Sequence, residues 1–268
     1  MTTALYPSAG NHSVQNAAFA IEWLSELSPT ELNAAMSAHA ELSGSLPQLN
    51  QATVMNFQIG IGAGGQPQML PAGVGGFTFS RPASAGGISR LLEVDRMRCV
   101  AQVNDYTRWK SVWPEVRKWF AAVIPKLGRR NFTSIGIQFN DVFHWRDRIE
   151  SFDPAQVFSA TSTLLPSGVL ENKLTWHSHH GYFVNIDQPI QSVLLENVNI
   201  NVVDNLNQRS VIITTVHKAK VDMWKWEEMD SNIDNLMEIL HQRNKAALAN
   251  VLSKSAAESI SLYAEVPK

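Results

Sequence analysis

The sequence contains little cysteine, little net charge and no long apolar run. Cys99 is the single cysteine among 268 residues, which excludes an intrachain disulfide and a multi-cysteine zinc site. The 22 Lys+Arg and 24 Asp+Glu give a formal net charge of -2, so no overall field attracts nucleic acid or an anionic membrane. No apolar run approaches the ~18 residues of a membrane-spanning helix, and the first residues do not resemble a secretory signal. We therefore expect a cytoplasmic protein with no transmembrane segment and no nucleic-acid partner.

Motifs that would name a reaction are also missing. The sequence contains no G-x-S-x-G, and Cys99 lies in an alternating apolar run that is typical of a buried, inert thiol. Glycines at residues 60–65 match the G-x-G-x-x-G spacing, but Pro67 and the residues after it prevent the helix that must follow in a dinucleotide site. We expect no catalytic residue and no cofactor, and a binding protein is favoured over an enzyme.

The composition is that of an ordinary folded protein, with 44% apolar and 17% charged residues. At roughly 150 residues per domain, the length fits about two domains or one tandem-repeat domain. Alternation and turn residues predict strands at 17–24, 53–61, 88–95, 98–104, 132–145, 174–186, 193–203 and 209–221. Nine of the fifteen glycines fall within residues 60–87, which we expect to be a long loop with one short strand at 76–80.

Three helices are predicted from capping signals and helical spacing. Ser28 and Glu31 form a capping box for a helix that ends near Gly44. A second helix follows Thr107, and Pro114 either kinks it or marks its true start. The third is a long helix over residues 231–253, capped by Ser231, and the last dozen residues are expected to be a loose tail.

The order of these elements predicts the fold class. Residues 1–130 and residues 131–268 each give the order strand, helix, strands, helix, which indicates a pseudo-repeat of two halves. We expect an α+β fold with a two-layer architecture, an antiparallel sheet carrying helices on one face. The order resembles the saddle-like tandem fold of TATA-binding proteins, although the near-neutral charge argues against transferring DNA binding from them.

Histidines are concentrated in one expected strand. His177 and His179 share a strand face, as two imidazole ligands of a metal ion must. Asp141, His144 and His217 are candidates for a third ligand. The alternative is a polar strand surface without a metal.

Two other groups of residues suggest an interaction surface. Asn197, Asn199 and Asn201 alternate with apolar residues, so a polar strand face meets solvent or a partner. Trp224 and Trp226 precede the last helix and serve either core packing or an interface.

One segment combines charges at the end of a strand. Residues 140–146 include an acid, a base and a cation near the point where the strand 132–145 ends, a place where functional sites often occur. Salt-bridged edge residues explain this segment equally well.

Several short segments resemble a known protein family. They are Asp95, the run Tyr106-Thr-Arg-Trp109, residues 135–140, and residues 236–241 followed by Asn244 and Leu248. Together they look like a sporadically distributed bacterial family of uncharacterised proteins of similar length. The resemblance implies that the family is distributed patchily among bacteria, as are accessory genes on mobile elements or in phage-defence loci. This distribution in turn implies a sensing or adaptor role.

The leading hypothesis is a non-catalytic binding or recognition module, the sensor or adaptor component of a bacterial anti-phage defence system. Its expected partner is a protein, either a separate effector or a phage protein. One alternative is a metal-dependent hydrolase that uses His177 and His179. Another is a homo-oligomeric scaffold that assembles through strand edges or through residues 224–226.

Overall fold

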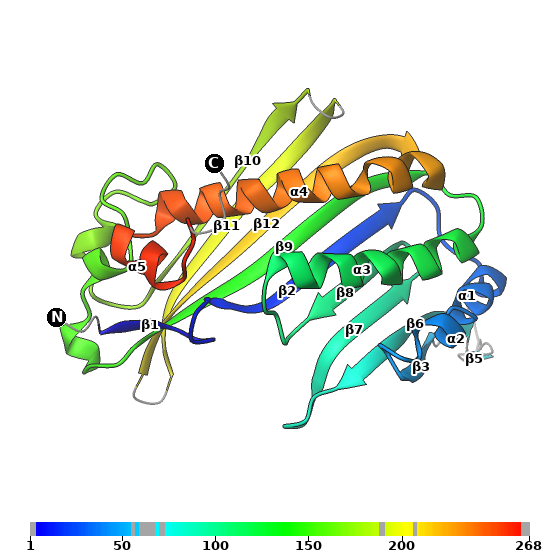
Figure 1. Ribbon diagram of the computed structural model, residues 1–268, viewed down its shortest axis with the longest axis horizontal. Coiled ribbons are helices and arrows are strands. Elements are labelled where there is room, and N and C mark those ends of the chain that lie inside the picture. The colour runs from blue at the N-terminus through cyan, green and yellow to red at the C-terminus, as the bar shows by residue number, and fades with distance from the viewer. Residues whose placement is uncertain are drawn as a thin grey trace, which may run out of the picture.

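The computed structural model describes residues 4–54, 57–58, 68–69, 73–187, 191–205 and 208–263. Within these residues the chain forms one ten-stranded antiparallel sheet with helices lying across it (Figure 1). The strands of this sheet are β1 (Leu5–Pro7), β2 (Val14–Trp23), β3 (Gln48–Val54), β6 (Gly73–Pro82), β7 (Ile88–Asp95), β8 (Arg98–Val103), β9 (Phe132–Trp145), β10 (Trp176–Ile186), β11 (Ser192–Asn205) and β12 (Gln208–Trp224). A separate two-stranded pair consists of β4 (Phe57–Gln58) and β5 (Gln68–Met69).

The strands follow the spatial order β10-β11-β12-β9-β2-β8-β7-β6-β3. β1 also pairs with β9, alongside the part of β9 that β2 leaves free. β2 and β9 are therefore central neighbours, with strands of the first half on one side and strands of the second half on the other. The division into two halves at residue 130 stays a prediction.

The helices are α1 (Pro29–Met36), α2 (His39–Leu42), α3 (Trp109–Val123), α4 (Trp226–Val251) and α5 (Lys254–Ser259), with 3-10 turns η1 (Ile124–Leu127), η2 (Ile149–Ser151), η3 (Pro154–Gln156) and η4 (Val169–Glu171). We call the sheet face against which α3 and α4 pack the near face, and the opposite face the far face. Thr215 on β12 belongs to the near face because it accepts a hydrogen bond from Asn244 of α4.

The predicted two-layer α+β fold with a helical face is wrong. Strand makes up 42% and helix 31% of the structure, which is a β-rich fold dominated by its sheet. The physical reason is the width of the sheet compared with that of a helix. Nine consecutive strands about 4.8 Å apart span roughly 38 Å, whereas each helix covers only about 10 Å, so α3 and α4 cannot form a complete second layer. The ten strands form one continuous sheet without a full layer of helices on one face.

Polar contacts join α3 to α4, one contact for each helical turn. The residue numbers rise along α3 while they fall along α4, so the two helices run antiparallel. The indole N–H groups that donate in two of these contacts lie at the buried seam between the helices, where an unpaired donor would be costly. The pairs are Trp109 with Glu238 (2.7 Å), Trp113 with Asp234 (2.8 Å) and Arg117 with Asp230 (2.6 Å).

Several predicted elements are confirmed and others shift. The predicted strands at 88–95, 98–104 and 132–145 correspond to β7, β8 and β9. The capping box of Ser28 and Glu31 is present at the start of α1, but the expected helix is divided into α1 and α2. α3 begins at Trp109 with Pro114 inside it, so Pro114 does not mark the helix start.

The glycine-rich segment contains more strand than predicted. Residues 59–67 and 70–72 lie outside the described residues, but β6 extends over ten residues where a short strand at 76–80 was expected. A Cβ atom at Gly76 would lie 2.5 Å from the carbonyl oxygen of Val94 on β7. Glycine is therefore needed at this position for the close approach of two strands.

The C-terminal helix begins earlier than its predicted cap. α4 starts at Trp226, and Ser231 lies inside it, where its hydroxyl donates to the carbonyl oxygen of Glu227 at 2.7 Å. A serine that bonds within its own helix does not terminate it. The expected loose tail is wrong up to residue 263, because α5 and the residues after it are folded.

Candidate functional site

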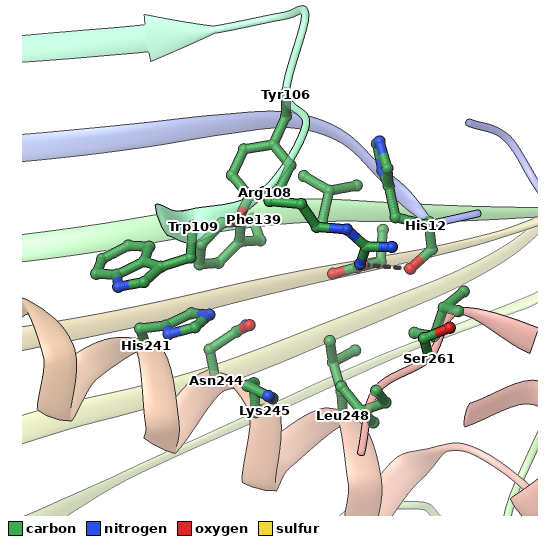
Figure 2. Close-up of a pocket in the computed structure, with 15 residues that line it drawn as sticks. His12, Tyr106, Arg108, Trp109, Phe139, His241, Asn244, Lys245, Leu248 and Ser261 are labelled. Atoms are coloured by element: carbon green, nitrogen blue, oxygen red, sulfur yellow. Dashed lines mark hydrogen bonds between the residues drawn. The ribbon is translucent and has the colours of Figure 1, made fainter. Parts of the chain in front are cut away.

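A pocket opens on the near face of the sheet where four segments meet (Figure 2). They are the loop between β1 and β2, the residues before and at the start of α3, the C-terminal half of α4, and the residues that follow α5. The centre of a water molecule can occupy about 80 Å³ of the space between its walls, and part of this space is open to solvent. A volume of this size holds several water molecules or one small ligand.

The floor of the pocket lies at an irregularity in the sheet. The pairing of β2 with β9 shifts between Val14 and Asn16, opposite Asp141. Because β1 has ended and β2 has not yet begun, the connecting loop places Ser13 beside β9, where its carbonyl oxygen accepts the N–H of Val142 at 2.8 Å. Bulges of this kind often re-aim a side chain next to a binding or active site.

Asp141 is fully buried at this floor. The Ser13 hydroxyl donates to its Oδ1 atom at 2.5 Å, whereas its Oδ2 atom has no hydrogen-bond partner among the described residues. Both Asp141 and Ser13 line the pocket. An unpaired buried carboxylate oxygen costs stability, so its presence in a pocket wall requires an explanation.

The environment of Asp141 changes its protonation. Burial raises the pKa of Asp141 to about 7, and the hydrogen bond from Ser13 opposes this only in part. Near neutral pH the carboxyl therefore exchanges between its neutral and ionised forms. A cation placed against Oδ2 would favour the ionised form.

Cationic side chains surround the pocket mouth. Arg108 and Lys245 are both half-buried. Arg108 Nη2 donates to the carbonyl oxygen of Asn11 at 3.3 Å, but neither cation forms an ion pair with an acid in the part of the chain that the structure describes. His12 lies nearby, and burial followed by the charge of Arg108 lowers its pKa. At neutral pH the mouth is therefore positively charged while the floor offers acceptor oxygens.

Aromatic and apolar side chains form the pocket walls. The rings of Trp109 and His241 are stacked with their centroids 4.2 Å apart, and Tyr106 meets Phe139 edge-on at 5.6 Å. Beside them, Asn244 directs its amide N–H to Thr215, and Figure 2 shows its oxygen end turned toward the pocket. The walls suit an apolar body, and the polar groups are concentrated at the floor and the mouth.

One wall residue has an unusual backbone conformation. Ser261 has φ 55, a left-handed value that favours glycine. Its N–H donates to Glu258, and the N–H of Leu262 donates to Ala257, which together form a Schellman motif at the end of α5. The strained turn brings Ser261 to the pocket wall, and such strain is common at binding sites.

The far face carries a row of polar side chains across the centre of the sheet. Asn140 Nδ2 donates to Asn16 Oδ1 at 2.7 Å, and Thr214 Oγ1 donates to Asn140 Oδ1 at 2.7 Å. Asn199 is the cross-strand partner of Thr214, and His179 is in turn the partner of Asn199. We call these five residues the polar row; it crosses β2, β9, β12, β11 and β10.

The structure places the predicted metal ligands on this far face. His177 and His179 are both exposed there on the edge strand β10, and Asn197 Nδ2 lies 3.0 Å from His179 Nε2. Among the described residues, no group of three or more His, Cys, Asp or Glu side chains is arranged to hold a metal ion. Asp141 and His217 lie on the near face, so the sheet separates them from the histidine pair.

The predicted interaction surface is partly brought together. Asn197, Asn199 and Asn201 are half-buried on the far face, opposite Gly181, His179 and His177 of β10 in turn. The two tryptophans lie elsewhere. Trp224 is only 9% exposed and belongs to the hydrophobic core, and half-buried Trp226 packs against that core. The asparagines therefore share a surface with the histidine pair, and Trp224 contributes little exposed area to any partner.

Cys99 is buried in the core, and burial raises the pKa of its thiol. A buried thiol that resists ionisation is a poor nucleophile. At the pocket, the Ser13 hydroxyl donates to Asp141 and not to an imidazole, so the two residues do not form the Ser-His pair of a catalytic triad.

Sequence reasoning did not identify Asp141 as the floor of a pocket. The charges of residues 140–146 had suggested a site near the strand end, but the alternation of buried positions along the strand had not been applied to Asp141. Ile137 and Phe139 occupy buried positions on β9, and Asp141 takes the next position on the same face. An acid at a core position of an alternating strand was the signal that could have found it.

No known protein family matches this chain, and no curated protein matches its sequence. Within the described residues, none of the helices is long and apolar enough to cross a membrane.

Proposed function

We propose that this chain is a non-catalytic recognition module that binds a protein partner across the far face of its sheet. The observation that carries this proposal is the polar row, which spans five adjacent strands. Its Asn16, Asn140 and Thr214 side chains are held by hydrogen bonds before any partner arrives. Side chains that are already ordered lose less conformational entropy on binding.

The chemistry of the row favours a protein partner. Its amide and hydroxyl groups can both donate and accept, so they match the backbone N–H and C=O groups of another chain. On the far face, Lys218 and Glu22 are paired with each other, because Lys218 Nζ donates to Glu22 Oε2 at 2.6 Å. A neutral face of this kind lacks the basic stripe that nucleic acid requires.

In this proposal the protein acts in the cytoplasm of a bacterium, as part of an anti-phage defence system that has a separate effector. The setting rests on the single cysteine and on the family resemblance given above. The partner is then either the effector or a phage protein.

Affinity purification of the tagged chain from its host, before and after phage challenge, tests the proposal. We expect a stoichiometric partner that is lost when Asn199→Arg and Asn201→Arg are combined on the far face. Asn235→Arg, the same change at an exposed position of α4, is the matched control and should retain the partner.

Two outcomes would contradict the proposal. Retention of the partner by the far-face variant would show that binding occurs elsewhere. A wild-type chain that elutes without other proteins but as a concentration-dependent oligomer in light scattering would favour the scaffold alternative.

A further inference from the structure

We propose that the pocket above Asp141 is a binding site for a small zwitterion of the α-amino-acid class, with the ammonium group at the floor and the carboxylate at the mouth. This site lies on the near face and is independent of the polar row.

The floor offers acceptors and calls for a ligand with several N–H donors. Asp141 Oδ2 has no partner among the described residues, and the oxygen end of Asn244 turns toward the same space in Figure 2. Ser13 donates to Oδ1 of Asp141 and Asn244 Nδ2 donates to Thr215, and neither group is bonded to Oδ2 in the free protein. A primary ammonium has three N–H donors and a positive charge, so it satisfies a buried carboxylate better than a neutral group does.

The mouth calls for an anionic group. Arg108 and Lys245 both line the pocket, and neither is paired with an acid in the described part of the chain. A guanidinium matches the two oxygens of a carboxylate, and the lysine adds a second positive charge. In Figure 2 the two cations reach the pocket from different elements, Arg108 from the residue before α3 and Lys245 from α4.

The walls leave room for an apolar side chain. Phe139, Tyr106 and Leu248 line the space between floor and mouth. The faces of Trp109 are already stacked, on His241 at 4.2 Å and on Trp113 at 5.8 Å. A ligand base therefore cannot stack on this indole, and an aliphatic or small aromatic amino acid fits the walls better than a nucleotide does.

The unpaired oxygen of Asp141 is also accounted for by this ligand. In the free protein the buried carboxyl is half protonated near pH 7, where its pKa lies. Binding of an ammonium group favours the ionised form and releases the proton. We therefore expect a fraction of a proton to be released per site near pH 7.

The test uses the whole chain and a matched set of ligands. The standard protein amino acids are screened by thermal shift and isothermal titration calorimetry at up to ~10 mM, a range that detects millimolar binding. For the tightest amino acid, the deaminated acid and the decarboxylated amine are compared with the parent; for leucine these are 4-methylpentanoate and 3-methylbutylamine. Titrations in buffers of different ionisation enthalpy measure the released proton.

We expect one or more amino acids to bind, and both analogues to bind at least about tenfold more weakly. Asp141→Asn should abolish the proton release and weaken binding, and Arg108→Gln should weaken binding of the amino acid while leaving that of the amine analogue unchanged. Asp147→Asn and Arg148→Gln are the same changes at exposed positions outside the pocket, and they should change neither the proton release nor the binding of the amino acid.

Several results would overturn the proposal. They are the absence of binding by all amino acids tested, equal binding by the analogue that lacks the ammonium group, and tighter binding of adenosine monophosphate than of any amino acid. If Asp141→Asn does not fold, Arg108→Gln and the analogue series on the wild-type chain still test the proposal. Failure here leaves partner binding by the far face unaffected, since that experiment uses other residues.

Discussion

Replacing Asp141 by asparagine should make the folded chain more stable at pH 8 and change its pH dependence. Asparagine keeps an oxygen that can accept the bond from Ser13, but it removes the ionisable group. Asp141 is 0% exposed and its Oδ2 atom has no partner among the described residues. An ionised carboxylate in such a place destabilises the folded state.

The size of the effect follows from the shift of the pKa. The pKa of Asp141 rises from the ordinary value of 3.8 to about 7 in the folded chain. Because the folded state holds the proton more tightly, stability from this group is fully present below about pH 4 and is lost as the pH rises through about 7. A shift of about 3 units corresponds to ~4 kcal/mol in total, of which about 3 kcal/mol is lost between pH 5 and pH 8.

Urea denaturation of the wild type and the variant between pH 5 and pH 8 measures this loss. His12, His241 and Lys245 also line the pocket, and they are present in both proteins, so their own titration largely cancels in the difference. The free energy of unfolding of Asp141→Asn minus that of the wild type should increase by about 3 kcal/mol from pH 5 to pH 8. Asp147→Asn, the same change at an exposed position outside the pocket, is the matched control.

A difference for Asp141→Asn that stays constant over this range would refute the reasoning. It would show that the carboxyl is ionised throughout, and therefore that a cation or bound solvent already satisfies it in the free protein.

Three further changes test other parts of the structure. Burial lowers the pKa of His217 from 6.5 to about 4, so the stability it contributes is lost as pH falls from 6.5 toward 4. His217→Leu should flatten that limb of a denaturation profile and, by removing two ring nitrogens without partners among the described residues, stabilise the fold by roughly 1–3 kcal/mol. Trp113→Phe should cost roughly 2 kcal/mol by calorimetry because it removes part of a buried aromatic side chain together with its hydrogen bond to Asp234. Asp234→Asn keeps an acceptor at an exposed position and should cost less; an equal loss would contradict this explanation. Ser261→Gly should raise the thermal midpoint by relieving a left-handed turn, a gain of about 0.5–1 kcal/mol, and a lower midpoint would show that the serine is not strained.

Local signals in the sequence predicted those elements whose cause is local. The capping box of Ser28 and Glu31 lies within four residues, and it forms as predicted. The strand at 132–145 was predicted from its alternation, and β9 has those bounds. The position of Gly76 could not be understood in this way, because the reason for a glycine there is a backbone atom of Val94 on a neighbouring strand.

The candidate sites also differ in how far local sequence patterns predict them. The shared face of His177 and His179 follows from strand periodicity, and the structure has it. The pocket required four segments to meet, and Asp141 and Lys245 are more than a hundred residues apart in the chain. Only the sheet order and the packing of α4 reveal that they line the same space.

The central position of β2 has a consequence for the synthesis of this protein. On one edge β2 pairs with β8 of the same half, but on its other edge it pairs with β9, which begins at residue 132. At 5–20 residues per second, the ribosome needs roughly 5–20 s to make the ~110 residues between them. During that time a long apolar strand has an unpaired edge, which is a site for aggregation. A nascent N-terminal half of this chain is therefore a natural client for a chaperone that covers exposed strands, and its productive folding depends on the arrival of β9.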